Sequence, residues 1–125
     1  MKKVIYTSEA PEPIGPYNQA ILHKDVLYVS GQIAIDPKTG DLVQNDIRSE
    51  THQVMTNISK ILSEAGMEFS DVLKCSIFIK NMNDFGEINQ IYEKYFSNEP
   101  PARETVEVSK LPKNVNVEIS CIASK

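Results

Sequence analysis

Two stretches with apolar residues at helical spacing separate the strand-like segments of this chain, and their order restricts the possible folds. The first begins at Ile47 behind a capping residue, Asn45 or Asp46, and stops at Gly66, a residue suited to a left-handed helix end. The second extends from about Asp84 to Phe96. Helices placed between strands imply crossover connections, so this order predicts a mixed sheet with both helices on one face.

The segments around these helices have the signatures of strands: some alternate between apolar and polar residues, and Val26–Ser30 is rich in β-branched and aromatic residues. They are Asn18–His23, Val26–Ser30, Leu73–Lys80, Arg103–Val108 and Val115–Cys121, with Lys3–Tyr6 as a short edge strand. Only Lys24-Asp25 joins the first two segments, which predicts a hairpin. Within the third, the inward face is expected to hold Leu73, Cys75, Ile77 and Ile79. With 125 residues in total, we expect one α+β domain spanning residues 1–125.

Two helices can cover one side of such a sheet, and no segment remains to cover the other. The residues expected on that second face mix apolar and polar types: Phe78, Ile122, Lys74, Ser76, Asn116, Glu118 and Ser120. A half-covered sheet that carries apolar side chains is more typical of an oligomer interface than of a solvent-facing surface. The sequence therefore predicts a homo-oligomer.

Composition narrows the range of partners. A formal net charge of -4 provides no positive field to gather phosphates, so we expect no nucleic-acid partner. No stretch approaches the roughly 18 apolar residues of a membrane span, so we expect no membrane association. Cys75 and Cys121 both lie within apolar stretches, which is typical of buried thiols in a reducing compartment. We therefore expect a cytoplasmic protein.

Familiar metal, nucleophile and phosphate motifs do not occur. His23 and His52 lack partners at a metal-ligand spacing, and both are expected at the surface. The cysteines lie on apolar strand faces, where they are core residues more often than nucleophiles. No two glycines have the spacing of a phosphate-binding loop. We expect no metal and no cofactor.

Two charged residues in the C-terminal third remain to carry chemistry. Arg103 follows the rigid Pro100-Pro101 turn, where it is either a salt-bridged surface residue or a guanidinium held for a planar anion such as a carboxylate. Glu118 lies in the middle of a strand, where it is either an exposed residue of an edge strand or a general acid/base held near Arg103. Together they form a minimal site for hydrolysing a small carboxylate-bearing substrate.

Several motifs along the chain resemble one protein family. They are Pro100–Val108, Leu111-Pro112-Lys113, Val117-Glu118-Ile119, Gly15-Pro16-Tyr17 with Ala20, Tyr28–Ile33, and Asn81–Phe85 with Asn89 and Tyr92. The sequence resembles the RidA/YjgF reactive-intermediate deaminases over essentially its whole length, with these motifs in the same order along the chain as in the family. The resemblance implies a chorismate-mutase-like α+β fold that assembles as a homotrimer, with clefts between the subunits.

The same resemblance implies an activity and a set of site residues. The activity is hydrolysis of 2-imino acids, chiefly 2-iminobutanoate and 2-iminopropanoate released by pyridoxal-phosphate enzymes, to 2-oxo acids and ammonia. Arg103 would clamp the substrate carboxylate, Glu118 would position or activate water, and Asn89 would support the site. The backbone around Thr105 would contact the imine nitrogen or water, although many relatives have Cys at that position. The cleft would be lined by Tyr17, Ser30, Gly31 and Ile33.

Two other functions stay open at this point. One is a non-enzymatic module that uses the same cleft to sense small carboxylates or to contact another protein. The other is an endoribonuclease, an activity attributed to some members of the family. The acidic charge balance and the lack of a histidine acid/base pair argue against ribonuclease activity.

Overall fold

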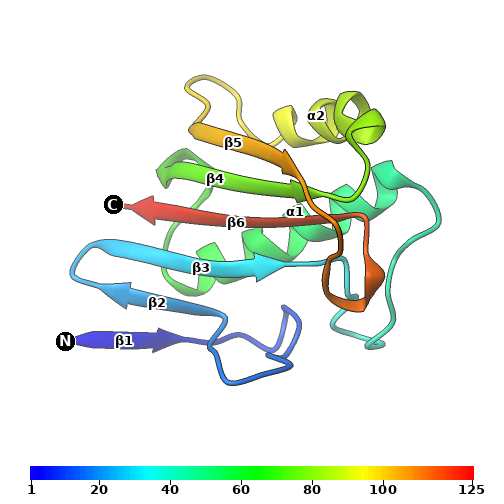
Figure 1. The fold of residues 1–125 in the computed structure, drawn as a ribbon. Helices are drawn as coiled ribbons and strands as arrows, with labels where there is room; N and C mark the ends of the chain where they lie inside the picture. The colour runs from blue at the N-terminus through cyan, green and yellow to red at the C-terminus, as the bar shows by residue number, and fades with distance from the viewer.

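A six-stranded sheet forms the framework of the molecule, with strand order β1-β2-β3-β6-β4-β5 (Figure 1). The computed structural model describes residues 1–125. Its elements are β1 Lys2–Ile5, β2 Ala20–His23, β3 Val26–Gln32, α1 Ile47–Glu64, η1 Phe69–Asp71, β4 Val72–Ile79, η2 Met82–Asp84, α2 Phe85–Glu93, β5 Ala102–Glu107, η3 Pro112–Asn114 and β6 Val117–Ser124. The β4–β5 pair is parallel and the other pairs are antiparallel, which confirms the predicted mixed sheet and its first hairpin.

Helix α1 begins and ends where the sequence predicts. The Asp46 side chain accepts a hydrogen bond from the backbone N–H of Ser49 at 2.8 Å, which satisfies one free donor of the first turn. Beyond the last turn, Gly66 adopts a φ of 72°, a left-handed conformation that glycine accepts without strain.

Helix α2 is shorter than the apolar pattern predicts, because it stops at Glu93 rather than Phe96. The backbone N–H of Tyr95 donates to the carbonyl of Tyr92, and that of Phe96 donates to Glu93, so the chain tightens into i→i+3 turns. Both aromatic side chains nevertheless pack against the core, as the helical pattern implied.

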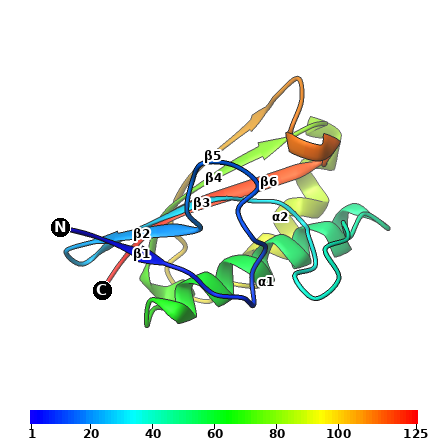
Figure 2. The same cartoon turned by 90° about the horizontal axis from the view of Figure 1, so that it is seen from below.

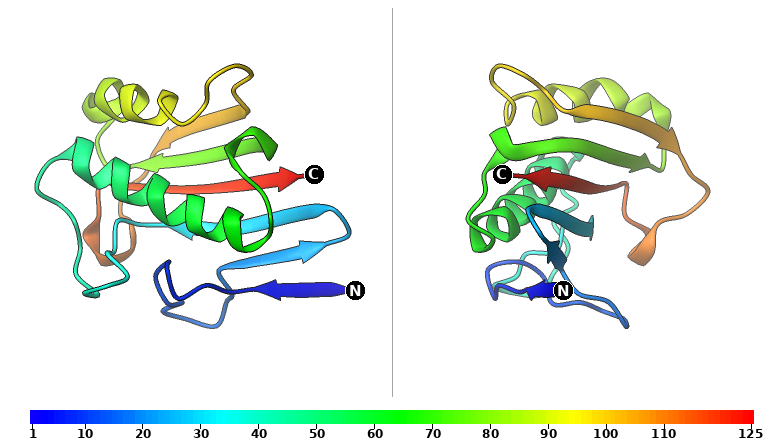
Figure 3. Two further views of the ribbon diagram at one scale, coloured as in Figure 1. Left: turned by 180° about the vertical axis from the view of Figure 1, so that it is seen from behind. Right: turned by 90° about the vertical axis from the view of Figure 1, so that its left-hand side faces the viewer.

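Both helices lie on the same face of the sheet, as predicted (Figure 2; Figure 3, left). The core fills the space between them and the sheet, and alternate residues of β6 supply much of it: Val117, Ile119, Cys121 and Ala123. The opposite face has no covering element. It carries two cross-strand apolar pairs, Tyr28 with Ile122 and Phe78 with Val106, of which Tyr28 is 50% exposed.

The inward face of β4 differs from the prediction at the first residues of the strand. A register shift against β6 falls between Val72 and Lys74. As a result Val72 is buried and Leu73, expected in the core, is 55% exposed.

Neither α1 nor α2 is long and apolar enough to cross a membrane.

Candidate active site

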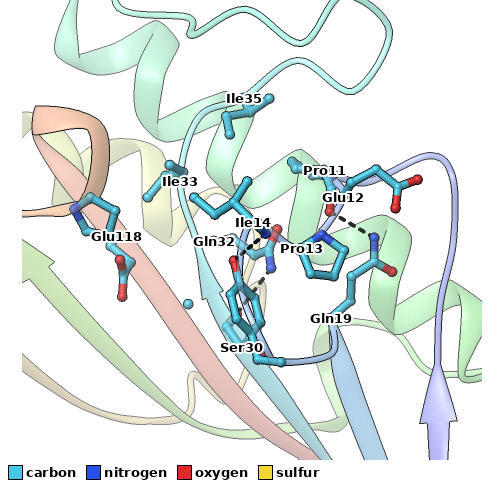
Figure 4. Close-up of a pocket in the computed structure, with 13 residues that line it drawn as sticks. Pro11, Glu12, Pro13, Ile14, Gln19, Ser30, Gln32, Ile33, Ile35 and Glu118 are labelled. Carbon is cyan, nitrogen blue, oxygen red and sulfur yellow. Dashed lines mark hydrogen bonds between the residues drawn. The ribbon is translucent and has the colours of Figure 1, made fainter.

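Glu118 faces a cavity of about 350 Å³ on the open side of the sheet. Five of the residues predicted for the site line it: Tyr17, Ser30, Gly31, Ile33 and Glu118. Figure 4 shows Glu118 on one side and the loop residues Glu12, Pro13 and Ile14 on the other. We call this cavity the glutamate pocket.

Glu118 is half-buried in a strand between β3 and β4, so its interpretation as an exposed edge-strand residue is wrong. Burial disfavours the charged form and raises the pKa of the Glu118 carboxyl above its usual value. A carboxyl with a raised pKa can exchange a proton nearer to neutral pH than an exposed one, which is what a general acid/base requires.

Gly31 makes room for this carboxylate. An added Cβ at this position would lie 2.3 Å from Oε2 of Glu118 and 2.7 Å from its Cδ. Any side chain at Gly31 would therefore push the Glu118 carboxylate out of its place. The backbone of Gly31 does not need a left-handed conformation, so the requirement for glycine is one of space.

The far wall of the glutamate pocket depends on Gln19, a residue that the sequence interpretation did not single out. Its buried amide nitrogen donates to the carbonyls of Thr7 at 2.9 Å, Pro11 at 2.9 Å and Ala10 at 3.3 Å. Its amide oxygen accepts from the backbone N–H of Thr7 at 2.8 Å. The backbone of Gln19 also accepts from the N–H of Ser30, so one residue joins the loop to β3.

Replacing Gln19 by alanine should loosen this wall and destabilise the protein. Several buried polar groups of the loop would lose their partner, which corresponds to a loss of about 3 kcal/mol in the free energy of unfolding. Urea unfolding measures the change, and Gln90→Ala serves as the control because Gln90 is exposed. Equal stability of the two variants would show that the loop holds its place without Gln19.

Asn57 supports the other wall in a similar way, and sequence reasoning missed it too. This fully buried residue of α1 donates to the carbonyls of Ile33 at 3.1 Å and Ile35 at 3.0 Å, just beyond the end of β3. Its own amide oxygen accepts from Gln53. A polar residue inside an apolar helical stripe was the available signal, because such a side chain must find partners when buried.

Arg103 lies on β5 and is held by α2. Its Nη1 donates to Oδ1 of Asn89 at 2.6 Å, which brings together two of the predicted site residues. The guanidinium carbon stands 5.5 Å from the ring centre of Phe85 and 5.2 Å from that of Tyr92, within cation–π range. The three residues of α2 that contact Arg103 share one helix face, since Phe85, Asn89 and Tyr92 stand at positions i, i+4 and i+7. This spacing is visible in the sequence.

Thr105 follows on the same strand face as Arg103, because Arg103 pairs with Cys75 and Thr105 with Ile77. Its Oγ1 is buried and has no hydrogen-bond partner within the chain. The Oη atom of Tyr92, next to the Arg103 guanidinium, is likewise buried without a partner within the chain.

Arg103 and Glu118 do not meet within one chain, contrary to the interpretation that Glu118 is held near Arg103. Arg103 is in register with Cys75, which is buried under the helices, whereas Glu118 is in register with Phe78 on the open face. Strand β4 also separates the two strands that carry them. One chain by itself therefore does not bring these two side chains into a common site.

The remaining candidates for chemistry lie elsewhere. His52 is half-buried rather than at the surface, because its Nδ1 lies 2.7 Å from Oη of Tyr95. His23 is exposed, as predicted. Cys75 and Cys121 are buried and unbonded, and burial raises the pKa of both thiols, which confirms them as core residues. No three His, Cys, Asp or Glu side chains are placed to hold a metal ion together.

Comparisons with known proteins agree over nearly the whole chain. A family model described as endoribonuclease L-PSP matches residues 7–125. A RutC family protein of Pyrococcus horikoshii is 52% identical, covering 100% of this chain and 99% of the relative. A 2-iminobutanoate/2-iminopropanoate deaminase of Bos taurus is 42% identical, covering 98% of this chain and 90% of the relative.

Solved structures match the fold as closely. The Rid family protein YyfA of Yersinia pestis superposes with a TM-score of 0.97 at 51% identity and full coverage of both chains. TdcF of E. coli, crystallised with bound serine, superposes with a TM-score of 0.95 at 36% identity, covering 98% of each chain. These matches confirm the fold class expected from the sequence.

Proposed function

The chain belongs to the RidA/YjgF family, and we propose that it hydrolyses small 2-imino acids such as 2-iminobutanoate and 2-iminopropanoate to 2-oxo acids and ammonia. The observation that carries the proposal is a half-buried carboxylate with a raised pKa, Glu118, in a pocket of small-molecule size. The relative from Bos taurus that is named for this activity supports the choice of substrate. Serine bound to TdcF supports a ligand with an amino-acid carboxylate.

We propose further that the protein acts as a homotrimer whose sites lie between subunits. Each site would pair the glutamate pocket of one subunit with Arg103 of its neighbour, since one chain holds these groups on opposite faces of its sheet. The open face offers Tyr28, Ile122, Phe78 and Val106 for burial in such a contact. A closed ring of identical contacts would complete every site in the assembly.

The chemistry needs few groups, because a protonated imine is already a strong electrophile. Arg103 would hold the substrate carboxylate through its planar fork, with Asn89 and two aromatic rings fixing the guanidinium. Glu118 would take a proton from a water molecule while the oxygen of that water adds to the imine carbon. The resulting carbinolamine would receive that proton on nitrogen. Glu118, again a carboxylate, would then take the proton of the carbinolamine hydroxyl as the C–N bond breaks, which releases ammonia and leaves the 2-oxo acid.

Residues around the pocket would orient this reaction. The backbone near Gly31 and Thr105 would hold the water or the nitrogen, and Tyr17 with Ile33 would enclose the substrate. Thr105 carries no thiol, so the scheme uses no covalent intermediate on that residue.

A coupled assay tests the proposed activity directly. Threonine dehydratase releases 2-iminobutanoate from threonine, and the rate of 2-oxobutanoate formation is followed with and without the protein. Faster release with the wild-type chain is the expected result. Unchanged kinetics together with tight binding of 2-oxobutanoate would favour a carboxylate-sensing module instead.

Ribonuclease activity, which the family description names, is the second candidate. Neither histidine lines the glutamate pocket, so Glu118 has no histidine partner there for acid/base cleavage of RNA. RNA cleavage by the wild type that disappears in both Arg103→Ala and Glu118→Gln would favour this reading over imine hydrolysis.

The pH dependence of hydrolysis should identify Glu118 as the proton acceptor. Since burial raises its folded-state pKa, the carboxylate is lost as pH falls through a value above that of an ordinary glutamate. The wild-type rate should therefore decline on the acid side at unusually high pH. Glu118→Gln should be slower by at least about 100-fold and lack this decline, and an identical acid limb in the variant would assign the ionisation to another group.

A further inference from the structure

Glu50 is a carboxylate with no exposed surface, and it lies outside the proposed chemistry. It projects from the first turn of α1 toward the beginning of β6. Its Oε2 accepts from the backbone N–H of Asn116 at 2.8 Å, and its Oε1 accepts from Nδ2 of the same residue at 2.8 Å. A buried carboxylate is costly unless it is fully hydrogen-bonded, and here both oxygens are directed at one residue.

Asn116 joins a strained turn to strand β6. In the turn, Lys113 and Asn114 have φ values of 55° and 56°, so two successive residues without glycine's freedom adopt the left-handed conformation. Lys80 at the end of β4 braces the same turn: its N–H donates to the carbonyl of Asn116 at 3.0 Å, and its Nζ donates to Oδ1 of Asn114 at 2.7 Å. Such backbone persists only where its surroundings hold it.

The strained turn leads directly into the glutamate pocket. Pro112, four residues before Asn116, and Glu118, two residues after it, both line that pocket. Strand residues alternate between faces, so a slip of one residue at the beginning of β6 would turn Glu118 toward the core. The two hydrogen bonds that Glu50 accepts hold Asn116, which lies between Pro112 and Glu118 in the sequence.

We propose that Glu50 is a positioning residue for Glu118, acting through Asn116 to hold the Leu111–Asn116 turn and the register of β6. The inference rests on the proposed function for its catalytic consequence, although the positioning itself can be measured without activity. We call the Glu50–Asn116 pair the clamp. The Arg103 side chain is held by Asn89 of α2 and has no hydrogen bond to the clamp, so recognition of the substrate carboxylate should not require Glu50.

Two variants at Glu50 test the proposal. Glu50→Ala should reduce the rate of 2-oxobutanoate release by about 10- to 100-fold, because a general base is displaced from its water. The Kd for 2-oxobutanoate, measured by calorimetry, should change by less than about 3-fold. Glu50→Gln should recover most of the rate, since its amide oxygen can accept from the Asn116 N–H while the Asn116 amide turns to accept from its NH₂.

Thr51→Val is the matched control. Thr51 is the next residue of α1 and is equally buried, but its hydroxyl bonds only to the carbonyl of Ile47 within the helix. If Thr51→Val slows hydrolysis as much as Glu50→Ala, or if Glu50→Ala weakens product binding in proportion to the rate, the clamp is merely structural and the proposal fails. Should Glu50→Ala not fold, Asn116→Ala, which removes one of the two bonds, should slow hydrolysis in the same selective way.

Backbone amide chemical shifts separate this inference from the proposed function. Glu50→Ala should move the NMR signals of Lys113, Asn114 and Glu118, whereas Thr51→Val should leave them in place. If the wild type does not hydrolyse imines, the proposed function fails, and these shifts still decide the positioning role. Unchanged shifts in folded Glu50→Ala would overturn it.

Discussion

Arg103→Ala should lose at least about 100-fold in imine hydrolysis while keeping the stability of the wild type, because the guanidinium would bind the substrate carboxylate. Arg103→Lys should also be poor. A lysine ammonium is a point charge without the planar fork, and it would not match the cradle formed by Asn89, Phe85 and Tyr92. The coupled assay with threonine dehydratase and a thermal melt measure the two properties.

Arg48→Ala provides the control for this result. Arg48 is another arginine that contacts α2, since its Nη1 donates to Oε1 of Gln90 at 2.8 Å. It lines neither the glutamate pocket nor the cavity next to Arg103. Its loss should leave hydrolysis unchanged. Full activity in Arg103→Ala would show that the carboxylate of the substrate is held elsewhere.

Gly31→Ala should have a comparable effect on hydrolysis through a different cause. The new methyl group would stand 2.3 Å from Oε2 of Glu118, and the end of that flexible side chain would move aside. The fold should therefore survive with a similar melting temperature, while hydrolysis falls by about 100-fold because the proton acceptor is displaced.

Gly86→Ala is the control for Gly31→Ala. Gly86 lies in α2, and an added Cβ there meets no atom within 4 Å. This variant should gain up to about 1 kcal/mol of stability from helix propensity and keep its activity. If Gly31→Ala retains full activity with Glu118 in its original position, the space next to Gly31 is larger than the structure indicates.

The sequence predicted the layers of this fold well because the apolar periods are strong. The stripe from Ile47 to Ala65 and the alternation in β6 each indicate one buried face, and together they place both helices on one side of the sheet. The end of α2 does not follow from the pattern, because the tightened turns after Glu93 keep the aromatic side chains on the same side as the helix does. The exposure of Leu73 follows from a register shift that no periodicity reveals.

The sequence indicates candidate site residues but not how they are arranged in space. Arg103 and Glu118 were identified from charge in apolar strands, whereas their opposite faces follow from the pairing of β4 with both β5 and β6. Strand pairing is a long-range property, and alternation within each strand leaves the relative face open. Gln19, Asn57 and Glu50 were missed because their partners lie up to 66 positions away in the sequence.

Mixing two inactive variants tests most directly whether each site is built by two chains. Arg103→Ala retains Glu118, and Glu118→Gln retains Arg103. In trimers assembled at random from equal amounts, each site has one chance in two of an intact Glu118 and one in two of an intact Arg103 from the neighbour. The proposal predicts recovery of about a quarter of the wild-type rate, once mass spectrometry confirms mixed trimers. Mixed trimers with no more activity than either variant alone would contradict a shared site.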